Sequence, residues 1–459
     1  MACVIHTNLY DDKVLVKVQK DLTKKIESGN KQYGTNQSKT VYVFSVNEQV
    51  ESRPCNVPFS YGLKSTLIDI ERPNRKNLLS MKHEFQGELR DEQKNCRNQA
   101  LTLLQERKSV MLSCYTGFGK TVTAINMASK IKLKTFIVVP KKPLLKQWES
   151  EIRTFLPDAQ TMVIEPSKIR LGLYPNPKLT PKARCVQKVD LTIIPDFCII
   201  NACNIHKLSR EFLKNYGLVI VDEAHLCMTE KLSENLLLLT PRYLLGITAT
   251  PYREDGYNVL FNRFFGEEKV KYTLNKKHAV YKVKTGFNPD KDKYIKYGPN
   301  YKSKVDWNTI LDEQSKDEKR NQLIINIVRQ FKDRIFLILV KRVEHGQYLM
   351  GILQQLGERV TSLLGKQQEF DKEARILIGT NSKIGTGFDH PRLDTLLAAA
   401  DMVSYYIQFI GRVMRRKDVE PIIFDLVDSH PTLKRHFEKR SKVYSKHGGE
   451  IIKFKENIG

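Results

Sequence analysis

The sequence feature that most constrains the fold is a glycine-bearing loop between an apolar run and a helix-compatible segment. The apolar run ends at Met111–Leu112, and the loop reads Cys-Tyr-Thr-Gly-Phe-Gly-Lys-Thr from Cys114 to Thr121. Gly117 and Gly119 let the backbone turn its N–H groups toward phosphate oxygens, and the start of a helix favours a bound anion. The segment therefore predicts a phosphate-binding loop.

Side chains within this loop add the chemistry of a nucleoside triphosphate site. Lys120 can reach the β and γ phosphates, and the hydroxyl of Thr121 can ligate Mg²⁺. Together with Thr116, Gly117 and Gly119, these residues are the candidate contacts to ATP. A Gly-Lys-Thr tripeptide in an arbitrary chain is usually only a turn, so the interpretation depends on a second element.

A buried strand that ends in two carboxylates supplies that element. Leu218–Val221 is apolar and short, as expected of a parallel strand, and it runs directly into Asp222 and Glu223. Asp222 would hold hydrated Mg²⁺, while Glu223 would orient or deprotonate the attacking water. The alternative is a helix N-cap aspartate followed by a first-turn glutamate. Because Asp222 follows Lys120 by 102 positions, the two elements together indicate an ATPase of the RecA-like kind.

Further motifs follow in an order that resembles the superfamily 2 helicases and translocases, over roughly residues 85 to 450. Gln93 stands where this family has a glutamine that reads the adenine edge; the alternative is a surface glutamine at a helix start. Pro140 and Lys141 follow the apolar run Thr135–Val139 and resemble the family's first nucleic-acid-contact segment. The resemblance implies ATP and Mg²⁺ as cofactors.

A group of motif residues also lies downstream of the two carboxylates. Thr248 and Thr250 resemble the motif that links the ATP state to strand movement. Arg253, Glu254 and Asp255 follow directly, and an Arg-Glu-Asp triplet at this place resembles the XPB-like branch of DNA translocases. This branch implies ATP-driven movement along DNA in a 3′-to-5′ sense.

The second half of the chain carries its own motifs. Arg334–Val340 is an apolar run of strand length. Thr380 opens a segment that resembles the family's contact to both the phosphate backbone and the nucleotide, with Gly387 and Asp389 on the nucleotide side. The spacing from threonine to glycine in this segment is one residue longer than in the commonest form.

A closing motif with two arginines follows the apolar run Leu396–Ala400. Gln408, Arg412 and Arg415 match the family's pattern, which implies that both arginines reach the γ-phosphate from the opposite lobe. An arginine supplied across a cleft neutralises charge in the transition state. The alternative is a basic helix start on a solvated face. The motif's position, 193 residues after Asp222, favours the catalytic interpretation.

Three segments resemble a narrower group, the XPB-related helicases of large DNA viruses. They are Glu318–Ile325, Phe424–Asp428, and the tail that contains Tyr444 and Gly448. The nearest type is the poxvirus transcript-release DNA helicase. The resemblance implies a viral protein that works with the transcription machinery or in DNA repair, located in the host cytoplasm or the virion.

Strand-like and helix-like segments alternate along most of the chain, which predicts an α/β fold with parallel sheets. We expect two tandem RecA-like lobes, at residues 85–268 and 313–459, joined by a basic connector at residues 269–312. ATP would bind between the lobes, at the carboxyl ends of their strands. Residues 1–84 are expected to form a small N-terminal accessory domain. The strand-like runs in that segment are Val14–Val18 and Val41–Ser45.

Composition agrees with a nucleic-acid enzyme. The net charge of +25 in 459 residues suggests a polyanionic partner, and a hydrophobic content of 41% is enough for packed cores. The eight cysteines are scattered without a CxxC pair, so we interpret them as free thiols in a reducing compartment and expect no metal besides Mg²⁺. No apolar stretch approaches 18 residues and the start lacks a signal-peptide profile, so we expect an intracellular, soluble protein without a membrane partner.

The connector is rich in lysine and tyrosine. Residues 269–304 contain eleven lysines and two aspartates. Alternation around Lys269, Lys271, Lys282 and Lys284 predicts a hairpin with one basic face. Such a face would grip a nucleic-acid strand, since lysines neutralise phosphates and rings stack on bases; the alternative is a solvated linker. A second basic cluster either extends this surface or forms a solvated helix face: Lys434, Arg435, Lys439, Arg440, Lys442 and Lys446.

Three classes of function remain compatible with the sequence. The first is an ATP-driven DNA helicase or translocase, working as a monomeric motor on single- or double-stranded DNA. The second is an RNA-dependent ATPase of similar architecture. The third is an ATP-gated nucleic-acid-binding module of a larger complex, such as the motor half of a nuclease. The Arg-Glu-Asp triplet favours the first.

Overall fold

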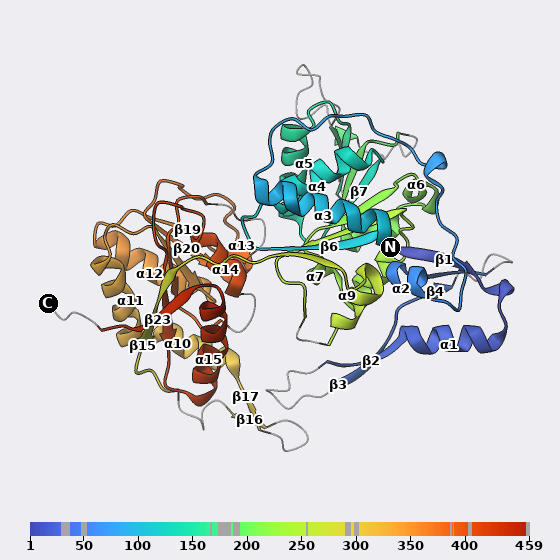
Figure 1. Ribbon diagram of the computed structural model, residues 1–459. Helices are drawn as coiled ribbons and strands as arrows, with labels where there is room; N and C mark the ends of the chain where they lie inside the picture. Colours follow the sequence, from blue (N-terminus) through green and yellow to red (C-terminus); the bar gives the residue numbers. More distant parts are fainter. Residues whose placement is uncertain are drawn as a thin grey trace. The chain divides into compact units, whose positions relative to one another are not determined.

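The structure is a computed structural model of the 459-residue chain. It describes residues 1–28, 37–46, 53–165, 168–172, 185–186, 193–253, 256–289, 295–297, 303–385, 388, 390–402 and 406–455. The chain forms two compact units (Figure 1). The first unit comprises Met1–Cys114 and Phe118–Tyr272, and the second comprises Tyr115–Gly117 and Thr273–Gly459.

The first unit is built on a sheet whose described strands run in the order β10-β9-β8-β11-β7-β12-β13-β6-β14. Seven of these strands are parallel: β6 (Ser109–Cys114), β7 (Thr135–Val139), β8 (Thr161–Glu165), β11 (Phe197–Asn201), β12 (Leu218–Val221), β13 (Tyr243–Thr248) and β14 (Lys269–Tyr272). The strands β9 (Lys168–Gly172) and β10 (Cys185–Val186) extend one edge in antiparallel pairing. Every residue of β7, β11, β12 and β13 is buried, which explains their apolar sequences.

Different elements cover the two faces of this sheet (Figure 1). Three contacting helices lie on one side: α3 (Asp91–Arg107), α4 (Lys120–Ile131) and α5 (Lys142–Phe155). The opposite side carries α6 (Arg210–Lys214), α7 (Ala224–Cys227), α8 (Glu230–Leu236), α9 (Asn258–Phe265) and the 3₁₀ helix η4 (Ala202–Lys207). Alternate residues of β7, Phe136 and Val138, pack into the core on that second side.

The N-terminal segment packs into this same core. It contains β1 (Ala2–His6), η1 (Thr7–Leu9), α1 (Asp12–Leu22), β2 (Thr23–Ser28), β3 (Gln37–Tyr42), β4 (Ser45–Val46), β5 (Pro54–Pro58), α2 (Phe59–Lys64) and η3 (Arg75–Asn77). One antiparallel sheet runs β1-β5-β4, and β2 pairs with β3. Ala2, Val57 and Phe59 share a core with Phe264 of α9. Residues 1–84 therefore belong to the first compact unit, and a separate accessory domain that ends at residue 84 stays a prediction.

The predicted strand at Val14–Val18 is also wrong, because these residues lie in α1. Asp11 caps the helix, and its carboxylate accepts a hydrogen bond from the Val14 N–H at 2.9 Å. Val14, Val18 and Leu22 repeat every four residues, so a helix places them on one face, where Val18 and Leu22 are buried. The end of the helix then turns directly into β2.

The second unit contains a parallel sheet in the order β19-β20-β18-β21-β22-β15-β23. Its strands are β15 (His278–Lys284), β18 (Phe336–Val340), β19 (Val360–Leu363), β20 (Ile376–Thr380), β21 (Thr395–Ala398), β22 (Ile422–Val427) and β23 (Gly449–Lys453). A separate short pair joins β16 (Ile295–Tyr297) to β17 (Ser303–Val305). The apolar runs at Arg334–Val340 and Leu396–Ala400 are confirmed as strands: β18 lies inside the first run, and β21 overlaps the second from Leu396 to Ala398.

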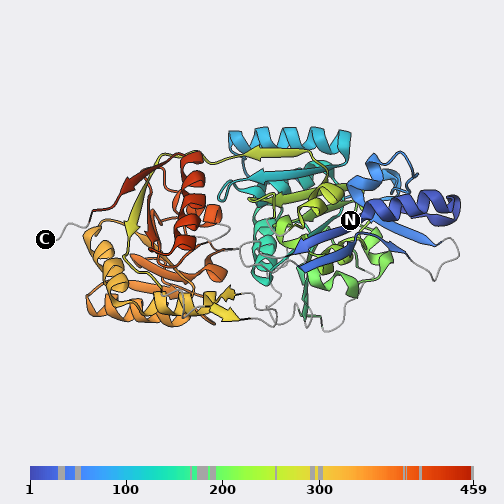
Figure 2. The ribbon, with the colours of Figure 1, turned by 90° about the horizontal axis from the view of Figure 1, so that it is seen from below.

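Helices lie on both faces of the second sheet (Figure 2). One core joins β18 and β20 to α11 (Glu318–Gln330) and α12 (Val343–Gln355). The opposite core joins the sheet to α13 (Asn381–Gly385), α14 (Tyr406–Val413) and α15 (Pro431–Lys446). The helix α10 (Trp307–Lys316) precedes α11. No helix in the described parts of either unit is both long and apolar enough to cross a membrane.

The predicted hairpin between residues 269–274 and 279–284 is wrong. β14 pairs in parallel with β6 at the edge of the first sheet, whereas β15 lies between β22 and β23 in the second. The alternation of side chains identified two strands but carried no information on their partners. Because β14 belongs to the first unit, that unit ends at Tyr272 and not at the predicted boundary of residue 268.

Candidate active site

The loop between β6 and α4 turns through two glycines with positive φ. Gly117 has a φ of 89° and Gly119, the N-cap of α4, has a φ of 86°. Other residues rarely adopt this conformation, and a Cβ atom at Gly119 would lie 2.2 Å from Nε2 of Gln93. The ammonium of Lys120 donates a hydrogen bond to the Cys114 carbonyl at 3.0 Å, which bends the lysine back over the loop. Thr121 follows it in the first turn of α4.

Gln93 packs against this loop from α3. Its Oε1 accepts a hydrogen bond from the Arg90 N–H at 2.8 Å, and its Nε2 donates one to the Phe118 carbonyl at 2.9 Å. The Arg90 guanidinium donates to the same carbonyl. The side chain is only 5% exposed. The amide of Gln93 thus fixes the start of α3 to the glycine loop. A glutamine on the surface, which was the alternative interpretation, would not make this contact.

The two predicted catalytic carboxylates lie at the end of β12. The Asp222 N–H donates to the Val138 carbonyl at 2.9 Å and so continues the pairing of β12 with β7. Its Oδ1 accepts from the Glu223 N–H at 2.8 Å, and its Oδ2 accepts from the indole N–H of Trp148 at 2.8 Å. Burial, and next the charge of Glu223, raise the pKa of Asp222 to about 6. Glu223 itself has a φ of 42°, a strained conformation for a residue with a side chain.

The donor set at this end of the sheet fits hydrated Mg²⁺ and a triphosphate. The positive charge of Lys120 lowers the pKa of Asp222, although less than burial raises it, so the ammonium lies within electrostatic range of the carboxylate. Thr121 and Asp222 supply a hydroxyl and a carboxylate, the oxygen ligands that Mg²⁺ prefers. A buried carboxylate with a raised pKa also gains from a nearby divalent cation, because the cation favours its ionised form.

Polar contacts connect Glu223, through His225, to the Thr248–Thr250 motif. Nδ1 of His225 lies 2.8 Å from Oγ1 of Thr248 and 3.4 Å from Oε2 of Glu223. The Thr248 hydroxyl donates to the Thr250 carbonyl at 3.2 Å and accepts from the Thr250 N–H at 3.0 Å. The proton of the Thr248 hydroxyl is donated to the Thr250 carbonyl. Nδ1 of His225 must therefore be protonated and donate its hydrogen bond to Oγ1 of Thr248.

The charge state of His225 agrees with this assignment. Burial first, and then the charge of Arg253, lower the pKa of His225 to about 3, so the ring is neutral near pH 7. The Arg253 guanidinium also donates a hydrogen bond to the His225 carbonyl at 2.5 Å. Lys141, the N-cap of α5, follows Pro140 and adds its charge to the same surroundings. Glu254 and Asp255 lie outside the described residues.

The predicted residues of the second unit lie on and around α14. Gln408 and Arg412 are buried on this helix. The Arg412 guanidinium donates to the carbonyls of Phe388 at 2.5 Å and Gly385 at 2.6 Å, so it holds main chain of its own unit. Arg415 follows the helix, and burial lowers its pKa.

Thr380 lies at the end of β20. Its hydroxyl forms a hydrogen bond with that of Ser382, with the oxygen atoms 3.2 Å apart. Gly387 and Asp389 lie outside the described residues.

The four lysines predicted to form one face of a hairpin lie on strands of two different sheets. Lys269 and Lys271 lie on β14 in the first unit, while Lys282 and Lys284 lie on β15 in the second. The Lys282 ammonium sits 4.7 Å from the centre of the Phe437 ring. The prediction of a single basic hairpin surface is therefore wrong, because each pair of lysines is held by a different sheet.

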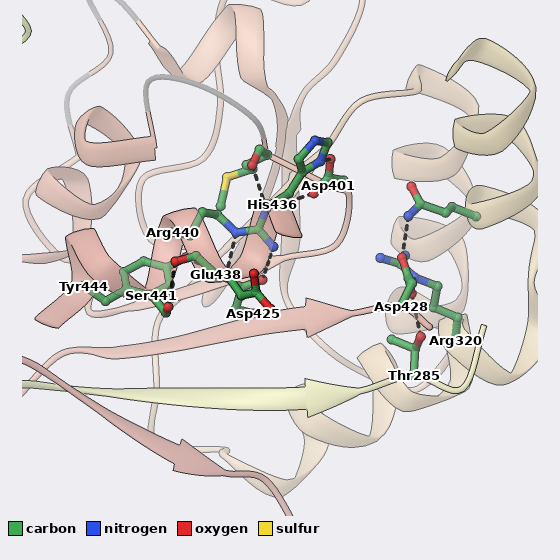
Figure 3. A network of polar contacts seen from close by, with 12 residues as sticks. Thr285, Arg320, Asp401, Asp425, Asp428, His436, Glu438, Arg440, Ser441 and Tyr444 are labelled. Carbon is green, nitrogen blue, oxygen red and sulfur yellow. Dashed lines mark hydrogen bonds and ion pairs between the residues drawn. The ribbon is translucent and has the colours of Figure 1, made fainter. Parts of the chain in front are cut away.

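The second unit contains a buried ionic network that the sequence analysis did not predict (Figure 3). Arg440 is 2% exposed and donates to both oxygens of Asp425 and to Oδ1 of Asp401, each at 2.8 Å. The Tyr444 hydroxyl donates to Asp425 at 2.8 Å, and the His436 ring lies 2.6 Å from Asp401. Arg440 is therefore not part of a solvated basic face. The available signal was an aspartate inside the apolar strand Ile422–Val427, since a buried carboxylate needs a partner.

A second buried arginine lies beside this network (Figure 3). Nε of Arg320 donates to Oδ1 of Asp428 at 3.1 Å, and the Thr285 hydroxyl donates to the same oxygen at 2.5 Å. Gln314 donates to the other oxygen of Asp428. The segments around Arg320, Asp425, Asp428 and Tyr444, which resemble the viral helicases, thus build the interior of this unit.

Comparisons with known proteins agree with this architecture. The family described as "Type III restriction enzyme, res subunit" matches residues 86–253. "Putative helicase 161L" of Invertebrate iridescent virus 6 is 41% identical over 475 residues, covering 99% of this chain and 100% of that protein. "Putative helicase 109L" of Invertebrate iridescent virus 3 is 61% identical over 303 residues, covering 64% of this chain and 87% of that protein.

More distant proteins are also similar to this chain. "Transcript termination protein OPG145" of Variola virus is 23% identical over 419 residues, covering 84% of this chain and 75% of that protein. The solved structure of S. cerevisiae Dbp5 bound to RNA and ADP BeF3 superimposes with a TM-score of 0.52 at 15% identity, covering 79% of this chain and 90% of that one. The superposition shows that the fold is that of two RecA-like lobes. The chain therefore belongs to the iridovirus helicase family, within the superfamily 2 helicases.

Proposed function

We propose that this helicase is a DNA-stimulated ATPase that moves along DNA in a 3′-to-5′ sense as a monomeric motor. The observation that carries the proposal is the continuous polar chain from Glu223 through His225 to Thr248 and Thr250. It joins the carboxylate assigned to water activation to the motif assigned to strand movement. The proposal assigns to these polar contacts the coupling between the two motifs.

Within this proposal each residue of the first unit has a defined task. Lys120 leaves the Cys114 carbonyl and binds the β and γ phosphates, and the amino end of α4 adds N–H donors. Thr121 and Asp222 would hold Mg²⁺, which when bound neutralises phosphate charge. Glu223 accepts the proton of the attacking water. Gln93 transmits contact with the base to the glycine loop through the Phe118 carbonyl.

The two arginines of the closing motif in the second unit have different roles in this proposal. Arg415 acts on the charge that develops on the γ-phosphate. Arg412 serves chiefly to hold the segment at residues 385–388, because its guanidinium already donates to two carbonyls there. The family pattern implies contacts with the nucleic-acid strand and the nucleotide for three further residues, Thr380, Gly387 and Asp389. Pro140 and Lys141 contact the strand from the first unit.

One observation favours a nucleic-acid partner in general, a second favours DNA, and a third favours a role in transcription. The net charge of +25 suits a polyanion. The Arg253–Asp255 triplet resembles the XPB-like DNA translocases. A viral relative carries the name transcript termination protein, which supports transcript release as the biological task. An RNA-stimulated ATPase is the second candidate, because the superfamily includes proteins that bind RNA, such as the Dbp5 of the solved complex.

The test is the rate of ATP hydrolysis with single-stranded DNA, duplex DNA, RNA or no nucleic acid. We expect DNA to raise turnover more than RNA of the same length and sequence. Movement is then measured by displacement of streptavidin from biotin at the 5′ or the 3′ end of single-stranded DNA. Faster displacement from the 5′ end supports the 3′-to-5′ sense. Stronger stimulation by RNA would replace the DNA assignment with the RNA alternative.

A further inference from the structure

Trp148 is a fully buried residue of α5 whose polar atom faces the end of β12. The indole is 0% exposed, and its N–H donates to Oδ2 of Asp222 at 2.8 Å. Buried indole N–H groups usually find a hydrogen-bond partner, and most side-chain hydrogen bonds in proteins go to the main chain or to water. Here the partner is the carboxylate assigned to the metal. A hydrogen bond to an ionised group is shorter and stronger than one between neutral groups.

This hydrogen bond fixes the orientation of the Asp222 carboxylate. Oδ1 is held by the Glu223 N–H and Oδ2 by Trp148, both at 2.8 Å. Two donors on opposite oxygens leave the carboxylate with one rotamer, so the remaining lone pairs point in set directions. Polar partners that orient a metal ligand in this way contribute strongly to metal affinity in proteins.

The same indole also connects Asp222 to the opening of α5. The buried residues of this helix, Leu144, Leu145, Trp148 and Ile152, anchor it in the first unit. Six positions separate Lys142, the first helical residue, from Trp148, so the two lie about 9 Å apart along the helix axis. Because the helix is continuous over that distance, a displacement of the whole of α5 that begins at the Pro140–Lys141 loop would move the indole with it.

We propose that Trp148 is a positioning residue that holds Asp222 for hydrated Mg²⁺ and passes strand contact at the α5 loop to the metal site. The proposal rests on the assigned role of Asp222 in the proposed function. Trp148 is not one of the residues that the sequence analysis predicted to bind ATP or Mg²⁺. Removal of the N–H donor is expected to weaken Mg²⁺ binding about 10- to 100-fold, as for other outer partners of metal ligands.

The chain contains two tryptophans, Trp148 and Trp307, which makes a direct test possible. Trp307 lies in the second unit beside His436, with ring centres 5.6 Å apart. In full-length Trp307→Phe protein, all tryptophan emission comes from Trp148. We expect this emission to change when Mg²⁺ is titrated in the presence of ADP, and to stay constant with Mg²⁺ alone or with ADP and EDTA. An emission that ignores Mg²⁺ in the presence of ADP would overturn the proposal, even if Trp148→Phe fails to fold.

The second arm compares Trp148→Phe with wild type and with Trp307→Phe. Binding of a fluorescent ADP analogue is measured at increasing Mg²⁺ concentrations. We expect the half-saturating Mg²⁺ concentration to rise 10- to 100-fold for Trp148→Phe and to stay unchanged for Trp307→Phe. Affinity for the analogue in EDTA should be equal in all three proteins. Equal Mg²⁺ dependence in a folded Trp148→Phe protein would refute the role of the indole.

The third arm measures whether strand contact reaches the metal site. The half-saturating Mg²⁺ concentration is determined with and without single-stranded DNA. We expect DNA to lower this concentration for wild type and to leave it unchanged for Trp148→Phe. If DNA lowers it equally in both proteins, the link through α5 is wrong. If Lys120→Ala still hydrolyses ATP at the wild-type rate, the proposed function fails instead, and the two failures are distinguishable.

Discussion

The substitution Arg440→Met should destabilise the second unit by about 3–5 kcal/mol, because removing one partner of a buried ion pair leaves the others uncompensated. The guanidinium donates to Asp425, to Asp401 and to the Met402 carbonyl, at 2.6–2.8 Å. Both aspartates are almost fully buried, so water cannot replace the lost donors (Figure 3). Methionine keeps much of the side-chain volume, which limits the effect to charge and hydrogen bonding.

The assay is urea unfolding followed by the fluorescence of Trp307, which lies against His436 in the same network. A Trp148→Phe background makes Trp307 the sole reporter and confines the signal to the second unit. The control is Arg435→Met, which removes an exposed arginine from the same helix. Removal of the exposed Arg435 side chain should change the free energy of unfolding by less than about 0.5 kcal/mol.

The pH dependence provides an independent check. Burial alone would raise the pKa of Asp401, but the hydrogen bond with His436 and the charge of Arg440 lower it overall. A carboxyl group with a lowered folded pKa stabilises the protein above its unfolded pKa of about 3.9, and this contribution is lost as the pH falls through the folded value. The difference between wild type and Arg440→Met should therefore narrow below about pH 4. A difference under 1 kcal/mol at pH 7, or one that stays constant down to pH 3, would refute the reasoning.

Three further predictions concern catalysis. Lys120→Ala should lower ATP turnover at least about 100-fold while DNA affinity stays close to wild type; Lys130→Ala, at the far end of α4, is the control, and parallel ATPase and DNA-binding titrations decide. Glu223→Gln should bind Mg²⁺ and ATP but hydrolyse very slowly, so that DNA stays bound in the presence of ATP; unchanged steady-state turnover would remove its assigned role. Arg415→Ala should lose turnover without loss of thermal stability, whereas Arg412→Ala should lower the stability of the second unit, because two carbonyl contacts disappear. Equal unfolding midpoints for the two arginine variants would contradict this division.

The local sequence was enough to predict the glycine loop and the buried strands on which the candidate nucleotide site is built. A phosphate-binding loop needs glycines at positions of positive φ, a lysine and a hydroxyl within eight residues, and all of these are fixed by chain order. The strands at Thr135–Val139 and Leu218–Val221 could be predicted because a parallel strand buried on both faces is a short apolar run. The two-lobe α/β fold followed from the repetition of such runs.

The tertiary structure alone decided which side chains meet. Lys269 and Lys282 alternate alike in sequence, yet their strands join different sheets, because strand partners are chosen by packing over the whole unit. Arg440 lies in a basic run but is buried against Asp425, and Trp148 is 74 residues away from the carboxylate that it contacts. Periodicity reports only which face of its own element a residue occupies. Contacts between elements depend on long-range packing, in which a buried charge or indole N–H takes whichever partner the fold brings within hydrogen-bonding distance.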